Sequence, residues 1–257
     1  MNFAGIPERI PEGKYRVVKG AAAREVEMSE TLRFLADDLQ LMALSFMAIV
    51  YILRIRWLLK FKASRERQAP SGSLNTSSLK GIVYSWANIA MPWSMESTRQ
   101  MIFFYMQFMI FHLAVAANIG MSFVIPYAPG LIKPILVVRA LQALFAAAFL
   151  IGCYRMYRRF SNPAIRLIST PDDIFSLGLL TVWSFVSIFA APNRPDLGEG
   201  ALRLYFILTA FFLIYVPFSK ISHYLYYPFT RFYFGRTMGH RGVYPLKRSP
   251  EPKPTRG

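Results

Sequence analysis

Residues 102–126 read IFFYMQFMIFHLAVAANIGMSFVIP, a run that contains no Lys, Arg, Asp or Glu. A helix needs about 20 apolar residues to cross the hydrocarbon core of a bilayer. The chain is 54% hydrophobic and has four more such runs. We predict spans at 39–59, 102–126, 134–154, 174–192 and 203–225. Because lipid cannot satisfy backbone groups, the prediction is an all-α integral membrane bundle of five transmembrane helices.

The sequence outside these runs predicts three parts: an extracytoplasmic N-terminal tail (1–38), a transmembrane domain (39–228) and a basic C-terminal tail (229–257). Within the first loop, residues 69–78 (APSGSLNTSS) have the composition of a flexible polar linker. The aromatic-rich stretch that follows, GIVYSWANIAMPWSMESTRQ at 81–100, is typical of a helix lying at headgroup level.

The charges of the tails, the loops and the ends of the spans predict the orientation. With five spans, one face collects twenty basic and five acidic residues, whereas the other collects ten basic and nine acidic residues. Cytoplasmic loops carry the excess of Lys and Arg, so we expect the N-terminus outside and the C-terminus in the cytoplasm, across the inner (cytoplasmic) membrane. This asymmetry accounts for most of the net charge of +16, and no nucleic-acid partner is expected.

Several classes of chemistry lack a signature. The single cysteine, Cys153, excludes an intramolecular disulfide, a CxxC pair and covalent haem attachment through CxxCH. No phosphate-binding loop, dinucleotide fingerprint or metalloprotease motif occurs. The predicted spans hold no carboxylate and no broken repeat pair, which argues against a transporter or channel.

The histidines carry the functional hypothesis. His112 lies within the second predicted span and His223 near the cytoplasmic end of the fifth, whereas His240 belongs to the basic tail. An intramembrane histidine costs free energy and usually has a function, although each could simply hydrogen-bond a helix carbonyl. Two histidines in the same half of the membrane indicate one bis-imidazole haem b, whose iron would be the bound metal. Lys220 and Arg231 are the candidates to pair with its propionates.

The segments YSWANIAMPWSMESTRQ, FHLAVAANIGMSFVIP and PFSKISHYLYYPFTRFYFGR, within residues 39–236, carry a family resemblance. The chain resembles the cytochrome b (gamma) subunit of membrane-bound respiratory nitrate reductase, nearer the branch found in membrane redox complexes of sulfate reducers. The resemblance implies that electrons pass between a membrane quinone and an iron–sulfur partner docked on one membrane face.

One difference from that family matters. Its members commonly hold two haems, with a second pair of histidines on the same two spans. Here the corresponding positions are Ser122, ten residues after His112, and Tyr205, eighteen before His223. We therefore expect the outer haem to be missing and the inner one retained. In the family the quinone site lies beside the outer haem, so it is in doubt whether this chain keeps that site.

Two groups of side chains could hydrogen-bond a quinone or menaquinone. The favoured inner group is Ser219, Lys220 and Ser222, and the outer group is Ser122, Tyr205 and Arg139. The leading hypothesis is thus an electron-transfer subunit of a respiratory quinone-linked oxidoreductase complex, with no catalytic residue of its own. The alternative is a haem-free membrane anchor that binds quinone or lipid, and a visible spectrum distinguishes the two.

Overall fold

The computed structural model describes residues 14–19, 22–61, 66–73, 75–88, 91 and 99–246, with side chains from residue 28 onward. The chain forms two compact units. The first comprises residues 1–50 and 109–219, and the second comprises residues 51–108 and 220–257.

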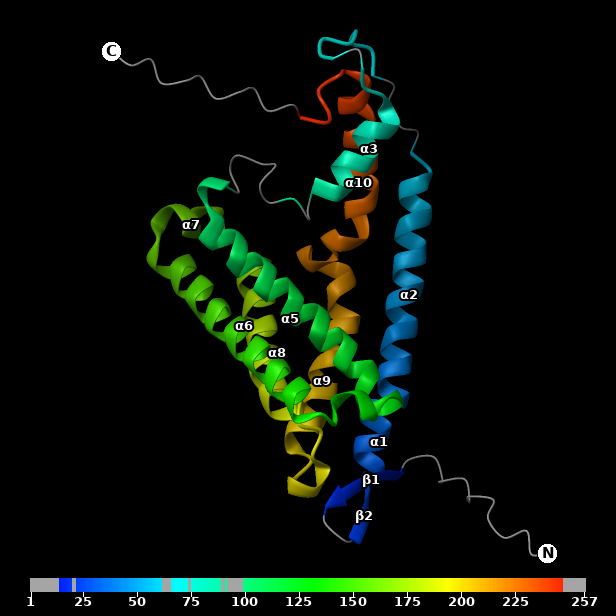
Figure 1. The fold of residues 1–257 in the computed structure, drawn as a ribbon, viewed down its shortest axis with the longest axis vertical. Helices are drawn as coiled ribbons and strands as arrows, with labels where there is room; N and C mark the ends of the chain where they lie inside the picture. Colours follow the sequence, from blue (N-terminus) through cyan, green and yellow to red (C-terminus); the bar gives the residue numbers. More distant parts are fainter. Residues whose placement is uncertain are drawn as a thin grey trace, which may run out of the picture. The chain divides into compact units, whose positions relative to one another are not determined.

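Helices dominate both units (Figure 1). The α-helices are α1 (Glu30–Ala36), α2 (Asp38–Leu59), α3 (Ser78–Ala87), α5 (Ile102–Tyr127), α6 (Ile135–Ser161), α7 (Pro163–Ile168), α8 (Pro171–Ala190), α9 (Gly200–Tyr215) and α10 (His223–His240). Short 3-10 helices are η3 (Pro129–Ile132), η4 (Pro195–Leu197), η5 (Val216–Phe218) and η6 (Lys220–Ser222). An antiparallel pair of strands, β1 (Lys14–Lys19) and β2 (Ala22–Glu27), precedes α1 and adds a small hairpin to the predicted helical fold.

Five helical segments are long and apolar enough to cross a membrane: Glu30–Leu59, Ile102–Tyr127, Ile135–Ser161, Pro171–Ala190 and Gly200–Phe218. Less than half of each apolar segment is buried inside the protein. Large apolar side chains are exposed instead, including Leu136 at 78%. Monomeric soluble proteins rarely expose apolar surface on this scale, so the fold is compatible with a multi-pass membrane protein, as predicted.

In the first unit, α6 packs along α8, and α8 packs against α9 (Figure 1). Gly152 of α6 meets Thr181 of α8 so closely that a side chain at residue 152 would collide with the threonine. The Trp183 indole donates a hydrogen bond to Thr209 Oγ1 at 3.1 Å, and Thr209 donates to the Tyr205 carbonyl at 2.8 Å. Small residues at the interface and hydroxyls bonded to helix carbonyls are how helices pack in lipid, where the hydrophobic effect does not hold them together.

The fifth predicted span, 203–225, extends beyond the apolar segment of the structure, which is Gly200–Phe218. Helix α9 ends at Tyr215, and Pro217 lies in the 3-10 turn that follows. Proline lacks an amide hydrogen and disfavours a regular helix over the preceding turn, although α5 and α10 accommodate Pro126 and Pro228. His223, predicted inside this span, is instead the first residue of α10 in the second unit.

In the second unit, α3 and α10 pack at backbone contact distance (Figure 1). An added Cβ at Gly235 would lie 2.6 Å from the Gly81 carbonyl oxygen, and Gly239 meets the Ser77 carbonyl similarly. The amides of Gly72 and Ser73 donate to the carbonyls of Arg241 and Gly242, each at 3.0 Å. The stretch predicted to be a flexible linker is therefore held by the end of α10, and that prediction was wrong for residues 71–73.

The predicted tail boundary at residue 228 falls inside α10, which continues to His240. The predicted headgroup-level helix corresponds to α3, whose Trp86 indole donates to the Pro228 carbonyl of α10 at 3.0 Å. Most of that stretch after residue 88, and the chain beyond residue 246, lie outside the described residues.

Candidate functional site

His223 opens α10 with an exposed ring whose Nδ1 lies 3.0 Å from the Lys220 carbonyl oxygen. A carbonyl can only accept, so Nδ1 donates in this contact, and Nε2 is the nitrogen that would bind a metal. Histidines that bind metals commonly have this arrangement, because the second bond fixes the ring and its tautomer. The local geometry of His223 therefore fits an axial haem ligand.

The start of α10 is also fixed to α2 within the second unit. The hydroxyls of Tyr51 and Tyr224 lie 2.5 Å apart, and Arg54 Nη1 donates to the Tyr226 hydroxyl at 3.4 Å. Burial raises the pKa of Tyr224 above its usual value, so this phenol stays protonated at neutral pH. His223 thus belongs to a positioned helix start.

His112 lies in the middle of α5, in the first unit, and its side chain is exposed. Buried residues one position before and two after it, Phe111 and Ala114, face the unit's interior. On the exposed side of α5, Gly120 follows two turns later, and a Cβ built there would meet nothing within 4 Å. Both His112 and Gly120 are therefore on exposed parts of α5.

The two predicted axial ligands thus belong to different units. Among the residues that the structure describes, no three His, Cys, Asp or Glu side chains are grouped so as to hold a metal ion. An axial haem pair needs only two imidazoles, so a haem depends on His112 and His223 alone.

The inner candidates for quinone binding follow one another between α9 and α10. Ser219 is buried and donates to the Val216 carbonyl at 3.1 Å, and Ser222 is also buried. Lys220, which is exposed, lies between them in sequence and accepts the His223 hydrogen bond through its carbonyl. Arg231 lies two turns further along α10, with its guanidinium carbon 5.4 Å above the Tyr227 ring.

The structure brings two of the three outer candidates together. Tyr205 of α9 is fully buried and donates to the Asn118 carbonyl of α5 at 2.6 Å, with Ser122 in hydrogen-bonding contact with its hydroxyl. A quinone oxygen could use the Tyr205 proton only by displacing a short existing bond. Arg139 lies apart on α6, where it is exposed and donates to Gln142 at 3.2 Å.

Asn118 is the polar residue that our sequence analysis overlooked. Its side chain is completely buried, and neither atom of the carboxamide has a hydrogen-bond partner among the described residues. An unsatisfied amide in an apolar interior costs free energy. The signal was available, since an asparagine inside an apolar span is as unusual as a histidine.

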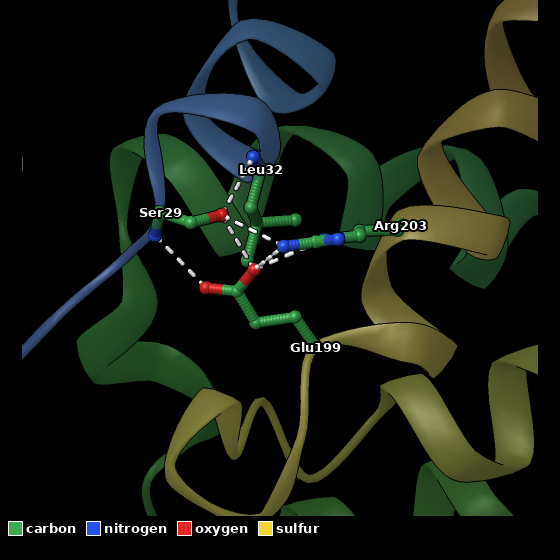
Figure 2. A network of polar contacts seen from close by, with 4 residues as sticks. All are labelled: Ser29, Leu32, Glu199 and Arg203. Atoms are coloured by element: carbon green, nitrogen blue, oxygen red, sulfur yellow. Dashed lines mark hydrogen bonds and ion pairs between the residues drawn. The ribbon is translucent and has the colours of Figure 1, made fainter.

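A second overlooked feature ties the start of α1 to the start of α9 (Figure 2). Glu199 accepts from the Ser29 amide at 2.8 Å, from the Ser29 hydroxyl at 2.5 Å and from Arg203 at 2.6 Å. Ser29 also caps α1 by accepting from the Leu32 amide at 3.1 Å. Burial alone would raise the pKa of Glu199, but these hydrogen bonds outweigh it and lower the pKa below its usual value. This network holds the start of α1 against the start of α9.

A third polar cluster joins the start of α8 to the end of α9. Tyr215 donates to Asp172 at 2.5 Å, and Ser176 lies 3.0 Å from the Tyr215 hydroxyl. Thr170 and Asp173 cap α8 reciprocally, which satisfies amides that a helix start leaves unpaired. Asp172 therefore has a role in positioning α8 and α9.

No family model matches the chain, and no curated protein matches it either.

Proposed function

We propose that this protein is a membrane cytochrome b subunit that holds one haem b through His112 and His223. The observation that carries the proposal is the His223 Nδ1 contact with the Lys220 carbonyl, which sets the tautomer that an axial ligand needs. The exposed position of His112 in the middle of α5 supports it, because a group outside the unit can reach this side chain. When bound, a bis-histidine haem supplies reversible one-electron transfer.

We further propose that the subunit belongs to a respiratory complex of the inner membrane, related to the nitrate-reductase gamma subunit. It would exchange electrons between a quinone or menaquinone and a docked iron–sulfur protein. The end of α6 carries Arg155, Arg158 and Arg159 and offers a basic surface for an acidic partner. Such attraction acts at long range and weakens with salt.

A visible spectrum of the purified, reduced protein tests the haem. We expect sharp α and β bands, a pyridine haemochrome value of one haem per chain, and loss of the bands in His112→Ala and His223→Ala. The matched control is His240→Ala, which removes a histidine outside the axial pair and should keep the spectrum. Because an alanine variant can misfold, His112→Gly and His223→Gly should also be measured, each with and without added imidazole. Imidazole should restore the bands by replacing the missing side chain.

A spectrum without these bands in fully folded protein would overturn the haem proposal and favour a haem-free anchor. Two haems per chain would mean that Ser122 and Tyr205 do not mark a lost site.

For the quinone we favour Ser219, Lys220 and Ser222, because the Tyr205 hydroxyl already donates to the Asn118 carbonyl. Haem reduction by a menaquinol analogue should slow in Lys220→Ala by about tenfold, the loss of one charge-assisted hydrogen bond. It should keep its rate in Tyr205→Phe, Ser122→Ala and Arg139→Ala. The opposite pattern would assign quinone chemistry to the outer group.

A further inference from the structure

One side of α10 has an open depression. Tyr227, Thr230, Arg231 and Phe234 line this hollow, which has a volume of about 400 Å³. Residues with this spacing share one side of a helix, so the four side chains form a continuous surface. Thr230 donates to the Tyr227 carbonyl at 3.0 Å, which leaves Arg231 as the charged donor of the hollow.

Arg231 is arranged for an anion. The Arg231 guanidinium carbon lies 5.4 Å above the Tyr227 ring, so the cation is held against one wall. The Tyr227 hydroxyl is buried, so Tyr227 contributes its ring and not its hydroxyl to the hollow. A guanidinium beside an open depression fits an anionic oxygen.

The charge of the second unit reinforces this assignment. Its described residues include ten Lys or Arg side chains, and Glu66 is the one carboxylate among them. Glu66 is itself engaged by Arg241 at 3.7 Å. No other described carboxylate of this unit is therefore available to neutralise Arg231.

The position of α10 in the chain indicates where the anion comes from. The last apolar segment ends at Phe218, and α10 begins at His223. It is not among the five membrane-spanning candidates of the described chain. Its sequence, HYLYYPFTRFYFGRTMGH, combines aromatic and basic residues, as segments at the level of lipid headgroups do.

We propose that this hollow binds the phosphate of an anionic phospholipid, with Arg231 as the donor and the rings of Tyr227 and Phe234 as apolar walls. The site goes beyond the electron-transfer function and does not depend on haem. It moves Arg231 from the predicted propionate partners to the lipid and leaves Lys220 as the propionate candidate.

Lipid titration of the full-length protein tests the site. Protein purified in detergent and depleted of lipid is titrated with phosphatidylglycerol or with phosphatidylcholine, and binding is followed by native mass spectrometry and by the thermal midpoint. Phosphatidylglycerol should bind and raise the midpoint more than phosphatidylcholine. Arg231→Ala should weaken its binding by about tenfold, as expected for a charged donor, whereas Tyr227→Phe should keep it within about twofold, because the ring remains and the buried hydroxyl does not reach the lipid.

The matched control is Arg236→Ala, which removes the same charge from an exposed position on α10 that does not line the hollow. Its affinity should stay within about twofold of the unmodified protein, because its charge acts only at a distance. Equal losses in Arg231→Ala and Arg236→Ala would overturn the site in favour of a diffuse basic surface. Loss of haem in Arg231→Ala with unchanged lipid binding would overturn it in favour of a propionate contact.

Discussion

Asn118 illustrates how a single side chain can be costly in this fold. Both atoms of its buried carboxamide lack partners among the described residues. Replacing it by leucine removes the desolvation penalty at similar volume, so Asn118→Leu should raise the free energy of unfolding by about 1–3 kcal/mol. Thermal unfolding in detergent measures this. Asn118→Ala also removes the amide but leaves a void, so it should raise the free energy of unfolding by less than Asn118→Leu does.

A loss of stability in Asn118→Leu would contradict this account. It would mean that the amide bonds a water molecule or a ligand in the native protein.

The carboxylate of Glu199 gives the fold a dependence on pH. Its pKa is lowered in the folded protein, so the stabilisation is complete above the ordinary value of about 4.5 and is lost as pH falls through the folded-state value. Glu199→Gln should lower the free energy of unfolding by about 1–2 kcal/mol at neutral pH, because hydrogen bonds to a partly exposed charged group are lost. The difference from the unmodified protein should shrink in melts below pH 4.5. A difference independent of pH would point to packing rather than charge.

At the scale of elements, the apolar runs predicted the helices well and their ends less well. The second span was predicted at 102–126, and α5 occupies Ile102–Tyr127. Hydropathy continued the fifth span to 225, but Pro217 ends α9 before it. Hydropathy averages over many residues, whereas the turn at Pro217 is local. Proline alone does not predict such a turn in this chain, because Pro126 and Pro228 lie inside α5 and α10.

The contact between α3 and α10 was beyond sequence reasoning, because it depends on glycines far apart in the chain. Gly81, Gly235 and Gly239 matter for the backbone approach they allow. Any of these glycines could equally have been a surface residue of a polar loop. Pairing of distant helices is set by tertiary packing, which local periodicity does not encode.

Two glycines should respond to the same substitution with opposite signs. A Cβ at Gly81 would lie 2.6 Å from the Gly239 Cα, so Gly81→Ala should destabilise the protein by about 1–3 kcal/mol through overpacking. At Gly120 nothing lies within 4 Å, so Gly120→Ala should gain up to about 1 kcal/mol from helix propensity. Thermal unfolding of the haem-free protein measures both. Equal effects at the two positions would refute the close contact of α3 and α10.

At the scale of the whole molecule, sequence reasoning identified the membrane class, and the structure confirms five segments able to span. The candidate site was predicted only as separate residues. Ser122 and Tyr205 do meet, but around Asn118, which hydropathy alone did not single out. His112 belongs to the first unit and His223 to the second. Whether two such residues pair depends on tertiary structure that spacing along the chain does not contain.

The predicted orientation makes a final test possible in intact cells. The distribution of Lys and Arg predicts that the α6–α8 connection faces the cytoplasm and the α8–α9 connection faces outward. With the single native cysteine removed by Cys153→Ser, one reporter is placed at a time, as Leu167→Cys in α7 or Leu197→Cys in η4. These leucines are 87% and 76% exposed, so neither substitution disturbs packing. A membrane-impermeant maleimide should label the cysteine at 197 in intact spheroplasts and the cysteine at 167 only after lysis. Labelling at 167 without lysis would place the face with twenty basic residues outside the cell. An iron–sulfur partner could then not dock on that face from the cytoplasm.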